Sequence, residues 1–321
     1  MPYSPATYRA PVWLPGGHAQ TLYAAALGRP KIAYRRERWE LPDGDFLDLD
    51  WLDGPSDAPL TVLFHGLEGD SRSVYALHLM AGLRRRGWRG VVPHFRGCSG
   101  DANRLPRAYH AGDSNEIDFI LRQLRQHNAA PMFAAGVSLG GNTLLKWLGE
   151  QGAAATEVLR AAAAVSAPLD LPAAGAALDR GFSRVYTAHF LRTLKRKTLA
   201  KLDRFPGLCS RSALQALNRI EAFDSLITAP LHGYRDAADY WRKSASKPGL
   251  PQIRVATLII NARNDPFMPG DVLPGQEEVS DQVTLEFPAQ GGHVGFVTGP
   301  FPGGFDWLPR RVLDYFSSAD R

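Results

Sequence analysis

Three residues of this chain have the types and the order along the sequence that nucleophilic acyl transfer requires: Ser138, Asp265 and His293. A serine hydroxyl becomes a nucleophile when a histidine accepts its proton and a carboxylate orients that histidine. Ser138 lies in a G-x-S-x-G run at 136–140, between an apolar run typical of a buried strand and a segment typical of a helix. The sequence therefore predicts a Ser-His-Asp triad with Ser138 as the nucleophile.

The segments around Ser138 indicate how it is positioned. A strand, a sharp turn and a helix around G-x-S-x-G form the nucleophile elbow of an α/β-hydrolase. We expect Gly136 and Gly140 to let strand and helix pass closely, with Ser138 in a strained backbone conformation. The same turn brings the backbone N–H of Leu139 to the start of the helix, where it can face an oxyanion.

The acid and the base follow the serine in the order known for this fold, Ser, Asp or Glu, then His. A near-continuous apolar run at 255–262 predicts a buried strand, and Asp265 comes directly after it. His293 follows a second predicted strand at 284–287. Because parallel strands end at one edge of a sheet, both loops are expected beside Ser138. Asp271 is the alternative acid, although it lies farther from the strand end.

A second oxyanion donor is expected after the predicted strand at 59–64. Gly66 lets the backbone turn there, so that the N–H of Leu67 can face the developing charge, an interaction typically worth about 3 kcal/mol in the transition state. His65 precedes the serine and so breaks the order of the triad. We interpret His65 as a structural residue that fixes this loop through hydrogen bonds.

Four segments resemble the YheT-like esterases, a branch of the α/β-hydrolases that also includes mammalian abhydrolase-domain lipases. They are G-G-H-A-Q-T-L at 16–22, H-G-L-E-G at 65–69, F-R-G-C-S-G at 95–100 and G-V-S-L-G-G-N at 136–142. With Asp265 and His293, these segments span nearly the whole chain. The resemblance implies the same triad, Ser138, Asp265 and His293, and it indicates no particular substrate.

The order of elements predicts an α/β-hydrolase fold: a mostly parallel sheet, helices on both faces and a helical cap. A hairpin at 32–51 is expected at the sheet edge, and Asp113 with Glu116 predicts a capping box at the start of a helix ending at Gln126. At 168–248 the alternation of strands and helices stops, which predicts the cap insertion. The 321 residues are expected to form one domain, in which 1–31 is an N-terminal extension packed on the core.

The composition argues against several classes of protein, namely membrane-spanning, secreted, disulfide-rich and metal- or cofactor-dependent proteins. No apolar run is long enough to cross a membrane, and the first residues lack the pattern of a signal peptide. The two cysteines, Cys98 and Cys209, indicate no disulfide framework, which favours a cytoplasmic protein. No metal-ligand spacing and no phosphate-binding loop is present, so the sequence predicts neither a metal nor a cofactor.

Basic residues are concentrated at 180–204, and from 179 to 204 eight of them accompany only two acidic residues, Asp179 and Asp203: Arg180, Arg184, Arg192, Lys195, Arg196, Lys197, Lys201 and Arg204. This segment predicts attraction to an anionic surface, either a weak contact with a membrane or the binding of an acidic substrate. The alternative interpretation is a solvated helical face. No nucleic-acid-binding module is recognised, so nucleic acid is not an expected partner.

The function that these observations favour is hydrolysis of a small-molecule or lipid carboxylic ester. An acyltransferase or a thioesterase would use the same residues and differ only in the acceptor or leaving group. A binding protein on a hydrolase fold is the alternative from another class, but its triad would usually be incomplete. The sequence leaves the acyl chain length, the physiological substrate and the oligomeric state open.

Overall fold

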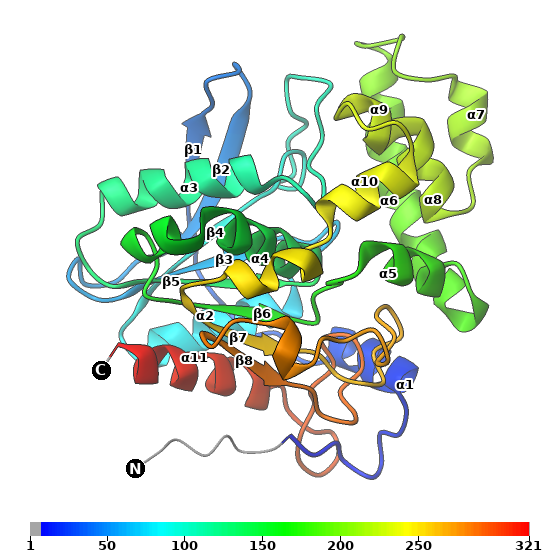
Figure 1. The fold of residues 1–321 in the computed structure, drawn as a ribbon. Helices are drawn as coiled ribbons and strands as arrows, with labels where there is room; N and C mark the ends of the chain where they lie inside the picture. Colours follow the sequence, from blue (N-terminus) through cyan, green and yellow to red (C-terminus); the bar gives the residue numbers. More distant parts are fainter. Residues whose placement is uncertain (1–7, 321) are drawn as a thin grey trace.

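A computed structural model describes residues 8–320, in which one eight-stranded sheet has helices on both faces (Figure 1). The strand order is β1-β2-β4-β3-β5-β6-β7-β8. Each strand from β3 to β8 runs parallel to its neighbours among these six, whereas β2 pairs antiparallel with both β1 and β4. The prediction of no signal peptide rests mainly on residues 1–7, which lie outside the described residues.

The strand bounds follow the predicted apolar runs closely. They are β1 (Arg35–Glu40), β2 (Phe46–Leu52), β3 (Leu60–Phe64), β4 (Arg89–Pro93), β5 (Met132–Val137), β6 (Ala161–Val165), β7 (Ala256–Ile260) and β8 (Val283–Glu286). The predicted edge hairpin is confirmed as β1 and β2. The α/β-hydrolase fold predicted from the sequence is therefore confirmed.

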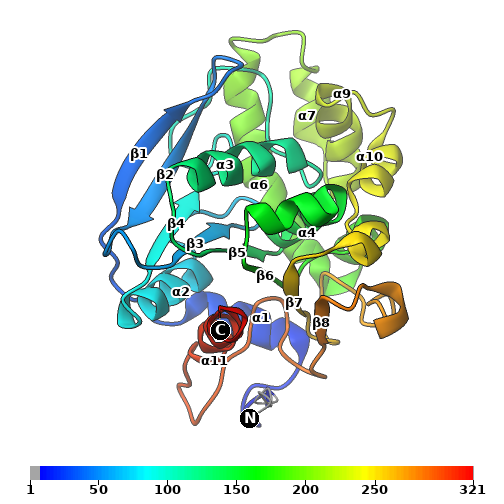
Figure 2. The ribbon, with the colours of Figure 1, turned by 60° about the vertical axis from the view of Figure 1, so that its left-hand side comes forward.

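Two apolar layers join the sheet to its helices, because the central strands β5 and β6 are buried at every position. One layer lies between the sheet and α3 (Ser114–Gln126) with α4 (Leu139–Gln151). The other lies between the sheet and three helices, which are α1 (Gly17–Ala26), α2 (Val74–Arg85) and α11 (Trp307–Ala319). Figures 1 and 2 show these two groups of helices on opposite faces of the sheet.

Residues 168–248, between β6 and β7, are helical and are called the helical insertion below. Figure 1 shows them to one side of the sheet. The segments are α5 (Leu171–Leu178), α6 (Arg184–Leu202), α7 (Arg211–Ala216), α8 (Ile220–Phe223), a π-helix (Asp224–Thr228), α9 (Ala229–Leu231) and α10 (Ala237–Ser244). Short 3₁₀ helices in the chain are η1 (Gly152–Glu157), η2 (Gly181–Ser183), η4 (Lys247–Gln252) and η5 (Gln276–Glu278).

The predicted capping box at the start of α3 is wrong. The helix begins at Ser114 and ends at Gln126 as expected, but the Asp113 side chain makes no cap hydrogen bond. Asp113 instead accepts hydrogen bonds from Arg107, and Glu116 accepts one from Arg96 at 2.6 Å. Two buried carboxylates beside guanidinium groups gain more from charge-assisted hydrogen bonds than from backbone N–H groups.

Candidate active site

Ser138 lies at the turn between β5 and α4 in a strained conformation, with φ of +53°. Glycines two residues before and after Ser138 allow the backbone of α4 to approach the backbones of β5 and of the end of β3 closely. A Cβ at Gly136 would lie 2.5 Å from the carbonyl oxygen of Gly140, and one at Gly140 would lie 2.5 Å from the carbonyl oxygens of Phe64 and His65. A positive φ in a non-glycine residue typically costs about 1–3 kcal/mol, so the surrounding packing must hold it.

The three residues expected to form a triad are in contact. The Nε2 atom of His293 lies 3.0 Å from the Oγ of Ser138, and its Nδ1 atom lies 2.9 Å from the Oδ2 of Asp265. His293 is on the loop after β8, and Asp265 is on the loop after β7. The Phe267 ring stacks on the imidazole of His293 at a centroid distance of 4.0 Å, which limits the orientations of that ring.

Asp265, rather than Asp271, contacts the imidazole. The Asp265 side chain is completely buried, and its Oδ1 also accepts a hydrogen bond from the backbone N–H of Phe267 at 2.8 Å. Asp271 is exposed, and its carboxylate makes no hydrogen bond to His293. A carboxylate that contacts Nδ1 leaves Nε2 free to accept the serine proton.

The loop that carries His293 is held by α1, from the other end of the chain. The Oγ1 atom of Thr21 accepts a hydrogen bond from the backbone N–H of His293 at 2.8 Å. The buried Gln20 accepts from the N–H of Gly291 at 2.9 Å and from the Asn264 amide at 3.0 Å. Gln20 therefore links the loops of His293 and Asp265. Sequence reasoning gave neither Gln20 nor Thr21 a role, and only their place in a segment typical of the family marked them.

The loop after β3 lies against Ser138, since a Cβ at Gly66 would be 3.2 Å from the Cβ of Ser138. The N–H of Gly66 donates to the Tyr75 hydroxyl at 2.9 Å, and the N–H of Glu68 donates to the Tyr109 hydroxyl at 2.8 Å. Among residues 8–320, the N–H of Leu67 between them has no hydrogen-bond acceptor. The N–H of Leu139, the first residue of α4, belongs to a helix start, where backbone donors lack partners within the helix.

His65 has the structural role that its place in the sequence indicated. Its Nδ1 lies 2.8 Å from the carbonyl oxygen of Gly66, and its Nε2 lies 3.1 Å from the backbone N–H of Phe95, which donates to it. Burial, together with the nearby His94, lowers the pKa of His65 to about 3. The imidazole is therefore neutral at physiological pH and fixes the loop that carries Leu67.

A cavity of about 780 Å³ connects Ser138 and His293 with the helical insertion. This volume is in the range of small-molecule binding sites. Much of its wall is apolar and comes from the insertion and from the loop after β7, including Leu171, Ala174, Leu178, Phe190, Phe223, Ile227, Trp241, Phe267 and Met268. An acyl chain of several carbons would find apolar surface there.

The basic segment at 180–204 is divided between two environments. Arg180, Arg184, Arg192 and Arg196 are exposed. Lys197 instead points to the core, where its Nζ lies 2.8 Å from Glu68 and 3.4 Å from the Sγ of Cys98. Lys201, which is half-buried, and Arg204, which is exposed, donate to backbone carbonyl oxygens of the core at 103–107. Within the segment, Lys197, Lys201 and Arg204 therefore contact polar groups of the core loops, whereas the four arginines named first are exposed.

Within residues 8–320, no helix combines the length and the apolar character needed to cross a membrane.

The family model described as alpha/beta hydrolase fold matches residues 59–300. The chain is 42% identical over 308 residues to "Putative esterase YheT" of Escherichia coli (strain K12), covering 94% of this chain and 90% of that protein. It is 29% identical over 325 residues to the mouse protein "Phospholipase ABHD3", covering 98% of this chain and 78% of that protein.

Among solved structures, the esterase Pf2001 of Pyrococcus furiosus superposes with a TM-score of 0.57 at 16% identity, covering 98% of each chain. Est1E of Butyrivibrio proteoclasticus, solved with ferulic acid, also superposes with a TM-score of 0.57, at 12% identity, covering 90% of this chain and 99% of that one. At such low identity these two structures support the fold alone.

Proposed function

Because this chain belongs to the α/β-hydrolase family, and within it to the YheT-like esterases, we propose that it hydrolyses carboxylic esters through an acyl-enzyme on Ser138. It is an enzyme of the esterase and lipase type. The observation that carries the proposed mechanism is the 3.0 Å contact between Nε2 of His293 and Oγ of Ser138. Both residues line a cavity whose wall also contains apolar side chains.

In the first step, the Oγ of Ser138 attacks the ester carbonyl carbon while Nε2 of His293 takes its proton. The new C–O bond forms, and the carbonyl π electrons move to the oxygen. Asp265 keeps Nδ1 protonated and stabilises the imidazolium. When the tetrahedral intermediate collapses, the bond to the alcohol oxygen breaks and His293 gives its proton to the leaving alcohol.

The negative oxygen of the intermediate accepts hydrogen bonds from the backbone N–H groups of Leu67 and Leu139. The contact of Gly66 with Ser138 supports this arrangement, because it brings the Leu67 loop next to the attacked carbon. Loss of one such donor typically costs about 3 kcal/mol of transition-state stabilisation.

In the second step, water attacks the acyl carbon as His293 removes its proton. The bond to the Oγ of Ser138 then breaks, the acid leaves, and the proton returns to the serine. The helical insertion acts as a cap that selects the acyl and alcohol groups, since its side chains supply much of the apolar wall. The expected substrates are therefore small-molecule or lipid esters.

The experiment that tests the proposed activity is hydrolysis of p-nitrophenyl esters of increasing acyl length by the wild type and by a Ser138→Ala variant. Acyl chains that fit the apolar wall should lower KM until the cavity of about 780 Å³ is filled. Transfer to an added alcohol or thiol at the expense of the free acid would assign an acyltransferase instead. No release of p-nitrophenol from any ester would contradict the proposed activity.

We propose that the exposed end of the basic segment contacts an anionic lipid surface. Two cations, Arg180 and Arg184, flank Phe182, and Val185 follows Arg184; both apolar side chains are half exposed, Phe182 at 51% and Val185 at 53%. An apolar side chain that enters the interface beside basic groups is the usual pattern of surface-bound proteins. Tyr186, on the next turn, packs edge-on against Phe267 at 4.8 Å, so this surface lies near His293.

Replacing Arg180 and Arg184 together with glutamine should weaken binding to phosphatidylserine vesicles by about tenfold or more at low salt, since each basic residue near such a surface contributes about 1 kcal/mol. Vesicle sedimentation measures this binding. The matched control replaces Arg85 and Arg310, two exposed arginines on α2 and α11. Equal loss in both double variants, or no wild-type preference for anionic vesicles, would contradict the proposed contact.

A further inference from the structure

Two cations at one end of the cavity have no carboxylate partner. Lys201, on α6, donates to the carbonyl oxygens of Pro106 at 3.2 Å and Arg107 at 2.8 Å. Arg204, just past the end of α6, donates to the carbonyl oxygens of Asn103 at 3.3 Å and Arg104 at 2.8 Å. Among residues 8–320, no carboxylate oxygen forms an ion pair with the charged nitrogens of either residue, and both residues line the cavity, Lys201 half-buried and Arg204 exposed.

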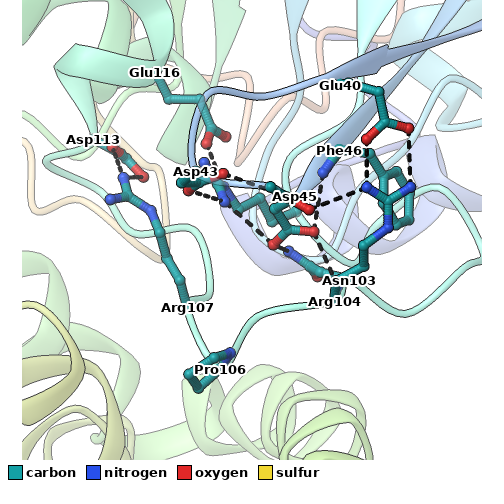
Figure 3. A network of polar contacts seen from close by, with 12 residues as sticks. Glu40, Asp43, Asp45, Phe46, Asn103, Arg104, Pro106, Arg107, Asp113 and Glu116 are labelled. Atoms are coloured by element: carbon teal, nitrogen blue, oxygen red, sulfur yellow. Dashed lines mark hydrogen bonds and ion pairs between the residues drawn. The ribbon is translucent and has the colours of Figure 1, made fainter.

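The carboxylates around the loop at 103–107, whose carbonyl oxygens accept from Lys201 and Arg204, are already bound to other cations, as Figure 3 shows. Asp43, Asp45 and Glu116 bind Arg96, while Glu40 binds Arg104 and Asp113 binds Arg107. Pro106 extends from this network toward the helical insertion. The contacts that residues 103–107 make with Lys201 and Arg204 thus involve carbonyl oxygens, which carry no net charge to balance the two cations.

The position of Lys201 is unfavourable for a cation in the protein alone. Burial and the nearby Arg96, Lys197 and Arg204 lower the pKa of Lys201 to about 8, opposed by Asp45. A cation that is partly desolvated beside other cations gains from any anion that reaches it. The third N–H of the Lys201 ammonium is available for such a group, because two carbonyl oxygens use only two of its three donors.

A chain of contacts relates these cations to the proposed active site. Leu67, the expected oxyanion donor, is followed by Glu68, whose carboxylate binds Lys197 at 2.8 Å. Lys201 lies one helical turn farther along α6, about 6 Å from Lys197 along the helix axis. Lys197 is paired with Glu68, whereas Lys201 contacts only uncharged carbonyl oxygens.

We propose that Lys201 and Arg204 bind a phosphate group on the substrate, which would make that substrate an ester between an apolar acyl chain and a phosphorylated alcohol. Two cations match the charge of a phosphate monoester, about −1.5 to −2 at neutral pH, better than that of a carboxylate. The apolar wall receives the acyl chain, and the basic end receives the phosphate. This inference rests on the proposed ester hydrolysis and names its substrate class.

The test compares two esters with the same short acyl chain, 1-hexanoylglycerol and 1-hexanoylglycerol 3-phosphate, by their kcat/KM values. The wild type should favour the phosphorylated ester. Lys201→Gln keeps a donor for the loop carbonyls and removes the charge, so it should lower the ratio of phosphorylated to neutral ester by about tenfold. Arg204→Gln should change the ratio in the same direction, and Lys201→Arg should preserve it.

The matched control is Lys195→Gln on the same helix. The Lys195 ammonium also donates to a backbone carbonyl, that of Gln215 at 2.7 Å, but it does not line the cavity. An unchanged ratio in Lys195→Gln with a reduced ratio in Lys201→Gln supports the phosphate site. A wild type that favours the neutral ester, or equal ratios in the two variants, would overturn it. Failure of the proposed function is distinguishable, because then neither ester is hydrolysed and Ser138 is not labelled by a fluorophosphonate.

Discussion

A Ser138→Ala variant is expected to fold normally and to lose ester hydrolysis by roughly 10³-fold or more. The substitution removes the Oγ that attacks the carbonyl and leaves the backbone of the elbow in place. Alanine meets the same strain as serine at a φ of +53°, so the stability should change little. Initial rates with p-nitrophenyl butyrate measure the loss, and thermal unfolding measures the fold.

Ser212→Ala is the matched control, since Ser212 is an exposed serine on α7 that does not line the cavity. It should keep the wild-type rate. If Ser138→Ala also kept a near-native rate, the assignment of the nucleophile would be wrong.

An Asp265→Asn variant should lose activity by about 10⁴-fold with Ser138 still in position. The asparagine oxygen can still accept from the N–H of Phe267, whereas its NH₂ group faces Nδ1 of His293. Nδ1 must then be the acceptor, so the proton moves to Nε2, and the imidazole can no longer take the serine proton. The measurement is kcat for a soluble short-chain ester.

Asp271→Asn provides the comparison, because Asp271 is the alternative acid and is exposed. Its activity should equal that of the wild type. A mild effect of Asp265→Asn together with a severe effect of Asp271→Asn would assign the acid to Asp271.

The fold was predictable because its parallel strands are continuous apolar runs. β7 (Ala256–Ile260) is buried at four of its five positions, and β5 and β6 are buried throughout. Local composition alone therefore identifies them. Ser138 and Asp265 come at or shortly after the ends of such strands, and His293 follows the shorter, partly buried β8, so the parallel sheet brings all three to one edge.

The support for the His293 loop was not predictable from spacing. Gln20 and Gly291 are 271 positions apart, and their hydrogen bond exists only because α1 packs against the loops that follow β7 and β8. The capping box failed for a related reason. Asp113 and Glu116 have the correct spacing for a cap, but arginines from the 96–107 loop reach them in the folded chain.

The direction of the cations on α6 also depends on the fold. When basic residues lie on several sides of a helix, the sequence pattern is the same whether their side chains face solvent or a loop of the core. Lys197, Lys201 and Arg204 become cavity residues only because the helical insertion packs over the loops after β3 and β4. The sequence indicated an excess of charge here, and the structure shows that the cations differ in whether they face solvent or the core loops.

Covalent labelling by a fluorophosphonate followed by peptide mass spectrometry tests most directly whether Ser138 is an activated nucleophile. The reagent reacts with a serine whose proton is taken by a neighbouring base, so the adduct should appear on the peptide containing Ser138 and increase in step with the loss of esterase activity. Ser138→Ala should carry no adduct, and Asp265→Asn should react far more slowly. An adduct on another serine, or full ester hydrolysis by a protein whose Ser138 stays unlabelled, would contradict the proposed mechanism.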